Sequence, residues 1–126
     1  MGGRVGGEPD LCGAFVVGHH VCTQGDHYDW MLDAGDSLIT FQCPAAPGAL
    51  PSGTAAAVRR LADHRRAYLT YEGPVSGGRG SIRIVERGRY EAWISPEGTW
   101  RVRTAGGGDF RLTPAGDDRY QLDRDG

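Results

Sequence analysis

Three of the four histidines in this chain lie in one short segment, where their spacing could bind a metal ion. His19, His20 and His27 are followed by Asp29. If His27 and Asp29 belong to a β-strand, they face the same way, because side chains two residues apart share a face. Two imidazoles and one carboxylate suit Mn²⁺, Fe²⁺ or Zn²⁺ better than Ca²⁺ or Cu⁺, with positions left for water or substrate. The alternative is a pair of surface histidines beside a strand.

The residues between and after these candidates predict a core on the other face of the same strand. Tyr28, Trp30 and Leu32 alternate with His27, Asp29 and Met31. An alternation with period two is typical of a strand that buries one side only. The aromatic face is therefore expected to be core, and the face that carries His27 and Asp29 is expected to be a site.

The charges are unevenly distributed along the chain, whose net charge is −2. Residues 59–103 contain ten arginines and five acidic residues, whereas residues 1–58 contain one arginine and six acidic residues. The chain has no lysine, so each basic side chain is a guanidinium, which is well shaped for bidentate contact with phosphate. The fourth histidine, His64, has four arginines near it in the sequence, Arg59, Arg60, Arg65 and Arg66, and this basic patch predicts a phosphate-bearing substrate. The alternative for such basic residues is a solvated surface.

Length and composition indicate one globular domain. The chain has 126 residues, 39% of them hydrophobic and 24% charged, and we expect a flexible segment at 1–12 and a single domain at 13–126. It contains no apolar run near the roughly 18 residues that a bilayer requires, and no secretory h-region. Three cysteines are too few for a disulfide framework, although Cys22 could complete a zinc site. We therefore expect a cytoplasmic monomer without a membrane partner.

Secondary-structure patterns predict a mainly β fold, a meandering barrel or a sandwich of about eight or nine strands with one short helix. The helix is expected at 54–62, where alanines follow a Ser or Thr cap, and it would lead to His64. The Gly-rich segment 73–80 lacks the ending of a phosphate-binding P-loop and is interpreted as a turn. The expected strands are 14–18, 27–33, 37–43, 67–72, 81–87, 89–95, 99–104, 110–113 and 119–123.

Several of these motifs, in this order, resemble a known family. The chain resembles the 3′-phosphoesterase domain of bacterial DNA ligase D over roughly residues 13–94. The resemblance implies a decorated antiparallel β-barrel that binds Mn²⁺ and removes 3′-phosphates and 3′-terminal ribonucleotides from DNA primers during repair. The implied partners are DNA or RNA–DNA 3′ ends and a repair ligase or polymerase. The motifs are Phe15-Val16-Val17-Gly18-His19-His20, His27-Tyr28-Asp29, Asp63-His64-Arg65-Arg66-Ala67-Tyr68, Glu72-Gly73, Gly77-Gly78-Arg79-Gly80 and Glu86-Arg87-Gly88.

Carried over by position, the resemblance assigns two sets of residues to the site. The metal ligands would be His20, His27 and Asp29, with Mn²⁺ the expected ion and Zn²⁺ possible. The catalytic and phosphate-contacting residues would be His64 and Tyr68, and either neighbouring arginine, Arg65 or Arg66, could add a bidentate phosphate contact.

The chain departs from the family pattern at three places. The family has a phosphate-binding arginine where this chain has Met31, and a thioether cannot bind an anion in that way. The interval before His27 is one residue longer, which leaves His19 and His20 as alternatives for the first ligand. The family's polar N-terminal arm has no counterpart in residues 1–13, so phosphate removal is better supported than ribonucleotide removal.

Two other functions remain open from the residues. A barrel of this kind could persist as an accessory domain that binds a metal or nucleic acid without catalysis. His27, Asp29 and a distant His64 also match the two-histidine, one-carboxylate set of iron oxygenases. The short interval between Asp29 and His64 and the small size of the chain weigh against an oxygenase.

Overall fold

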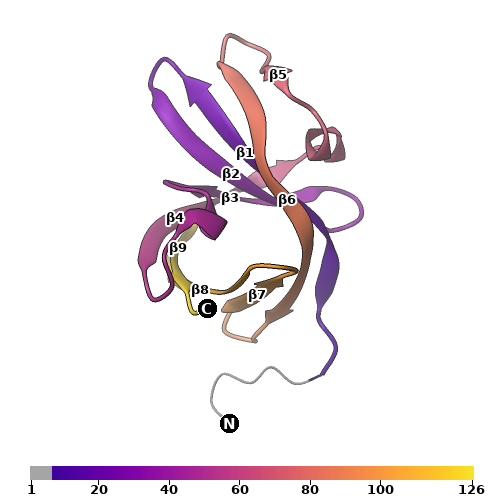
Figure 1. Cartoon of the computed structure of the whole chain (residues 1–126), viewed down its shortest axis with the longest axis vertical. Coiled ribbons are helices and arrows are strands. Elements are labelled where there is room, and N and C mark those ends of the chain that lie inside the picture. The colour runs from indigo at the N-terminus through magenta and orange to yellow at the C-terminus, as the bar shows by residue number, and fades with distance from the viewer. Residues whose placement is uncertain (1–6) are drawn as a thin grey trace.

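The protein folds into a closed antiparallel β-barrel (Figure 1). The computed structural model describes residues 7–126. The barrel strands follow the order β1-β2-β3-β4-β9-β8-β7-β6, and pairing of β1 with β6 closes the ring, while β5 adds to the free edge of β6. The predicted β-barrel is confirmed. The strands are β1 (Leu11–Cys22), β2 (Gly25–Asp33), β3 (Leu38–Cys43), β4 (Ala55–His64), β5 (Gly73–Pro74), β6 (Ser81–Ile94), β7 (Trp100–Thr104), β8 (Gly108–Gly116) and β9 (Arg119–Arg124).

The barrel interior holds the main hydrophobic core. The predicted alternation in β2 is confirmed, because Trp30 and Leu32 are buried in this core and Tyr28 packs against it. Trp30 meets Phe110 edge to face, with ring centroids 5.2 Å apart, across the barrel. The inward residues of β2 thereby fix which residues of the strand face outward.

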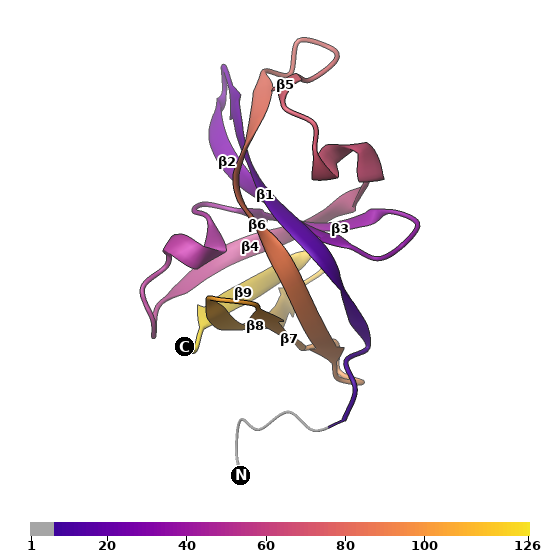
Figure 2. The same cartoon turned by 45° about the vertical axis from the view of Figure 1, so that its right-hand side comes forward.

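A second, smaller core lies on the outward face of the same strands. Met31, Leu38 and Ile82 are buried there together with Val16. The 3₁₀ helix η2 (Arg66–Leu69) covers this cluster through Tyr68 and Leu69. Figure 2 shows η2 and β5 beside the upper parts of β1, β2 and β6, above the closed barrel. Met31 therefore shares a face with His27 and Asp29, as expected, but it is core rather than pocket lining.

The helix predicted at 54–62 is wrong. This segment is strand β4, which pairs with β3 on one side and β9 on the other. Alanine has the highest intrinsic helix propensity, but a segment between two strands gains two ladders of hydrogen bonds, and tertiary context overrides propensity. Val58 points into the barrel core, whereas its neighbours Ala57 and Arg59 are exposed. Two 3₁₀ helices, η1 (Pro47–Ala49) and η2, are the helical elements of residues 7–126.

Three other boundaries also differ from the sequence pattern. Strand β6 runs without interruption through Gly88, where two strands and a turn were expected. A Cβ at Gly88 would lie 3.0 Å from the Phe15 ring, so this glycine allows close packing rather than a turn. The strand expected at 67–72 is η2 and a turn. Of the expected flexible segment 1–12, residues 1–6 lie outside the described part, and Leu11 and Cys12 belong to β1.

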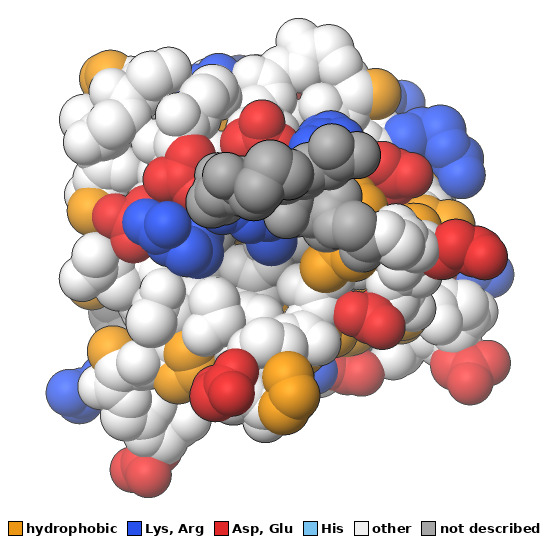
Figure 3. All heavy atoms as spheres, turned by 90° about the horizontal axis from the view of Figure 1, so that it is seen from below, with side chains coloured by type: hydrophobic (Ala, Val, Ile, Leu, Met, Phe, Trp, Pro, Cys, Tyr) orange, Lys and Arg blue, Asp and Glu red, His pale blue; other side chains and the backbone are white. Residues whose placement is uncertain are grey.

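The lower end of the barrel carries charges of both signs. Seen from below, acidic and basic side chains are interspersed on the visible face (Figure 3). Within the described residues, no helix is long and apolar enough to cross a membrane. The histidine-bearing parts of β1 and β2 lie at the other end, near their hairpin.

Candidate metal and phosphate site

The hairpin of β1 and β2 brings the predicted metal ligands together. His20 and His27 are cross-strand partners in the β1–β2 ladder. Their Nδ1 and Nε2 atoms, respectively, lie 3.2 Å apart. Two nitrogens that each lie about 2.0–2.1 Å from one tetrahedral zinc ion would be separated by about 3.3 Å. One ligand atom from each of His20, His27 and Asp29 lies within 4.8 Å of the others, so the group could hold a metal ion.

Asp29 supplies a buried carboxylate that lacks a hydrogen-bond partner. The residue is 3% exposed, and within residues 7–126 no group donates a hydrogen bond to its Oδ1 atom. His27 Nε2 lies 3.1 Å from this oxygen, but the contact does not have hydrogen-bond geometry. Burial raises the pKa of Asp29, with the nearby histidines opposing the shift. A cation in contact with Oδ1 would compensate this buried charge, so the residues fit a metal site.

The surroundings of His20 and His27 favour neutral imidazole rings that each have a nitrogen lone pair available for a metal ion. His20 Nε2 donates to the carbonyl oxygen of Arg79 at 2.5 Å, which leaves the Nδ1 lone pair of a neutral ring facing His27. Burial lowers the pKa of His27, with His20 adding to the shift and Asp29 opposing it. Metal binding requires the neutral ring, and a backbone carbonyl on the second nitrogen is a common way to orient a ligating histidine.

His19 lies apart from this group. Its Nε2 atom is 2.6 Å from Asp26 Oδ2, and its ring stacks on Tyr28 with centroids 4.4 Å apart. The hydrogen bond from His19 lowers the pKa of Asp26. Because consecutive residues of a strand face opposite ways, only one of the two adjacent histidines can face Asp29. The geometry selects His20 as the candidate first ligand.

A pocket of about 270 Å³ adjoins the candidate metal ligands. His64 enters it from the end of β4, and its Nε2 atom lies 3.9 Å from Asp29 Oδ2. The other ring nitrogen, Nδ1, donates to the carbonyl oxygen of Ala62 at 3.0 Å. Tyr68 follows from η2 and meets His64 edge to face, with centroids 5.8 Å apart. The pocket is lined by His20, Asp29, Asp63, His64, Arg65, Tyr68, Val75, Ser76, Arg79 and Ile82.

The arginines near the pocket have different roles. Arg65 lines it, with its guanidinium 5.9 Å from the centre of the Tyr68 ring. Arg66 is not among the lining residues, because its Nε and Nη2 atoms donate to the two carboxylate oxygens of Asp33 at 2.9 and 2.7 Å. This bidentate pair lowers the pKa of Asp33 and turns Arg66 away from the anion-binding role that was expected.

Arg79 also lines the pocket; it belongs to one of the motifs of the family resemblance, but the sequence analysis did not assign it to the site. Its Nε and Nη2 atoms donate to the carbonyl and hydroxyl oxygens of Ser76 at 2.7 and 3.2 Å, so the guanidinium is held in place. Gly80 next to it has φ +88°, and a Cβ there would lie 1.9 Å from the Val21 carbonyl oxygen. The sequence feature that could have indicated its role is that Arg79 is the single arginine of the Gly-rich segment 73–80. No pattern in the neighbouring residues indicated that this loop lies next to His20 in the folded chain.

Comparison of the chain with protein-family models and with curated proteins gave no match. The fold and the site are therefore described by their own geometry: a closed antiparallel barrel with a three-residue candidate metal site beside a pocket that carries two arginines.

Proposed function

We propose that the protein is a metal-dependent phosphoesterase that acts on 3′ ends of DNA, removing a 3′-phosphate and, less readily, a 3′-terminal ribonucleotide. The observation that carries this proposal is the orphaned Oδ1 atom of Asp29. Asp29 lies beside His20 and His27, and it is one of the residues that line a pocket with arginine, histidine and tyrosine side chains. A cation on one side and guanidinium groups on the other form a suitable environment for a phosphate ester.

In this proposal His20, His27 and Asp29 hold the metal, with Mn²⁺ the expected ion and Zn²⁺ the alternative. When bound, such an ion polarises a phosphoryl oxygen and lowers the pKa of a bound water. The His64 Nε2 atom faces the pocket, where a protonated ring would donate to a phosphate oxygen. Tyr68 lies next to His64 and can donate through its hydroxyl. Both residues would thus bind the developing negative charge.

The side chains of Arg65 and Arg79 support phosphate binding without an arginine at position 31. Met31 is fully buried in the second core and does not line the pocket. Arg65 and Arg79 approach from two other segments, the start of η2 and the loop before β6. A guanidinium at either place offers the bidentate, charge-assisted contact that the chemistry requires. We propose that this pair performs the role that the family assigns to the missing arginine.

The proposal is tested with a 5′-labelled DNA primer that ends in a 3′-phosphate, incubated with Mn²⁺. Phosphate should be released, release should stop with chelator, and His27→Ala should lower the rate by about 10²-fold or more. His19→Ala is the matched control, because this histidine lies one residue from His20 but faces away, and it should retain activity. Metal binding without phosphate release would contradict the enzyme and favour the accessory domain.

A further inference from the structure

We propose that a groove on the outer face of β2, β3, β4 and β9 binds the single DNA strand that leads to the 3′ end in the candidate site. This inference rests on the proposed function, and it adds a second binding region and the direction in which the strand runs. The groove has a volume of about 760 Å³, much larger than the phosphate pocket. His27 is one of its lining residues, so the groove begins at the metal ligands.

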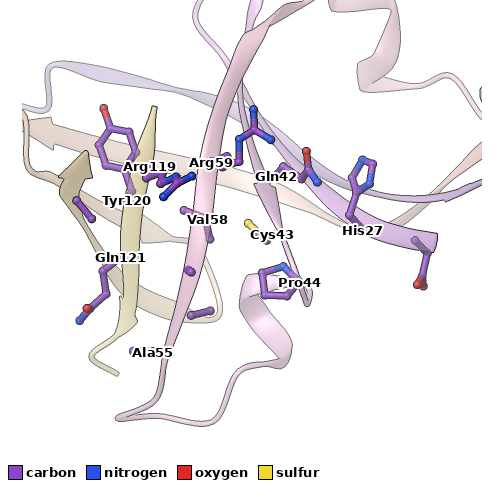
Figure 4. A pocket seen from close by; sticks show the side chains of 14 residues that line it. His27, Gln42, Cys43, Pro44, Ala55, Val58, Arg59, Arg119, Tyr120 and Gln121 are labelled. Carbon is purple, nitrogen blue, oxygen red and sulfur yellow. The ribbon is translucent and has the colours of Figure 1, made fainter. Parts of the chain in front are cut away.

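The ladder of strand pairs carries a polar row from the site into the groove. Asp29 of β2 is paired with Gln42 of β3, Gln42 with Arg59 of β4, and Arg59 with Arg119 of β9. Directly paired residues of antiparallel strands lie on the same face of the sheet. Figure 4 shows Arg119, Arg59, Gln42 and His27 following one another across these strands. The row therefore starts beside the buried Asp29, and its members from Gln42 to Arg119 line the groove.

The spacing of strands gives this row a length suited to a short oligonucleotide. Neighbouring strands are about 4.8 Å apart, which places the backbone of Arg59 about 10 Å and that of Arg119 about 14 Å from Asp29. Arginine side chains extend further along the surface. The 3′-terminal phosphate would occupy the pocket beside Asp29, and phosphates closer to the 5′ end would meet Arg59 and then Arg119.

The charges in the groove are available to a polyanion. Arg119 forms no ion pair within residues 7–126. Arg59 Nη2 lies 3.2 Å from Asp118 Oδ2, but both side chains are about half exposed, and such surface pairs contribute little. The lining contains these two arginines and one acidic residue, Asp26, which lies 2.6 Å from His19. The groove therefore offers a net positive surface to a phosphodiester backbone.

Small side chains leave room for the sugars and bases. Ala55 and Ala57 of β4 line the groove, together with Cys43 and Val58 of the barrel core. In Figure 4 Pro44 and Gln121 lie on opposite sides of β4. The small alanine side chains leave space in the groove, while Gln42 and Gln121 offer amide hydrogen-bond donors and acceptors. Phosphate contacts combined with an apolar floor bind a strand without demanding one sequence.

The test measures binding of 5′-fluorescein oligonucleotides with a 3′-hydroxyl, by fluorescence anisotropy in Mn²⁺. Affinity should increase with length over the first few nucleotides and then level off. Arg59→Ala and Arg119→Ala should each weaken binding three- to tenfold and reduce the salt dependence by about one phosphate contact. Arg103→Ala is the matched control, since Arg103 is 53% exposed and Arg59 58%, and each has a 3.2 Å ion pair.

A second readout separates this inference from the proposed function. If the protein releases phosphate, Arg119→Ala should lower kcat/KM for a 3′-phosphorylated oligonucleotide relative to that for a nucleoside 3′-monophosphate. Binding that depends on Arg59 and Arg119 without any phosphate release would support the groove and contradict the phosphoesterase. Phosphate release with unchanged oligonucleotide affinity in both variants, or competition only by an acidic protein, would overturn the groove proposal.

Discussion

Metal binding at Asp29 should stabilise the fold, and replacing this one residue should separate the metal effect from folding. Burial raises the pKa of Asp29, so the metal-free fold disfavours the charged carboxylate and loses stability as the pH rises above the ordinary value of 3.8. Asp29→Asn keeps the shape and removes the charge. The metal-free variant should therefore be at least as stable as the metal-free protein at neutral pH, although Asp29 is almost fully buried.

The size of the metal effect follows from mass action. An ion that binds only the folded protein, at a free concentration 100 times its Kd, stabilises by about 2.7 kcal/mol. For a domain of this size each kcal/mol raises Tm by about 3–5 °C, so the expected rise is about 10 °C. In Asp29→Asn the rise should fall below about 2 °C, because a neutral amide replaces the charged ligand.

The assay is differential scanning calorimetry of chelator-treated protein before and after addition of Mn²⁺ or Zn²⁺. Asp63→Asn is the matched control: Asp63 lines the same pocket, but Arg60 and Ser37 already bind its carboxylate. The Asp63→Asn variant should show the same metal-induced increase in Tm as the wild type. An equal rise in the wild type and in Asp29→Asn, or a loss confined to Asp63→Asn, would refute the assignment of the metal ligands.

Three further substitutions test other parts of the reasoning. Arg66→Ala should lower the free energy of unfolding only slightly at neutral pH, because its pair with Asp33 lies at the surface. In urea titrations this difference should decrease below the ordinary Asp value of 3.8 and vanish as the pH falls through the lowered pKa of Asp33. A large loss of phosphate release would contradict the placement of Arg66 outside the pocket. Met31→Arg should lower the free energy of unfolding by about 3 kcal/mol or more, since it buries an unpaired charge in the second core, and an unchanged denaturation midpoint would disprove that burial. Gly80→Ala should cost about 2 kcal/mol through its φ of +88° and its clash with the Val21 carbonyl, so wild-type stability would mean that the loop can rearrange.

Much of the fold could be predicted because side-chain alternation is a local signal. The pattern of Trp30 and Leu32 against Asp29 and Met31 identified both faces of β2. The alanine-rich segment could not be assigned in this way, because its intrinsic preference is helical, and only pairing with β3 and β9 makes it a strand. Gly88 was taken for a turn because its contact with the Phe15 ring is a tertiary feature.

In the candidate site, too, the residues that are close in sequence could be predicted, whereas the contacts made only in the folded chain could not. His20, His27 and Asp29 are close in sequence, and alternation within one strand predicted that His27 and Asp29 share a face. The choice of His20 over His19 required the pairing of β1 with β2, which places His20 opposite His27. His64 and Tyr68 also reach the pocket, as the family resemblance implied. The roles of the arginines could not be predicted, since Arg66 meets Asp33 and Arg79 meets His20 only in the folded chain. Charge alone does not tell which guanidinium remains free.

The opposite faces of the sheet also bear on how this protein could change its specificity. The barrel core depends on the inward residues of β2, β3, β4 and β9, whereas Gln42, Arg59, Arg119 and Gln121 face outward into the groove. Variation at these four outward positions leaves the inward packing intact. A library randomised there should change what the groove binds at little cost in folding, with the candidate metal ligands of the adjacent hairpin kept constant.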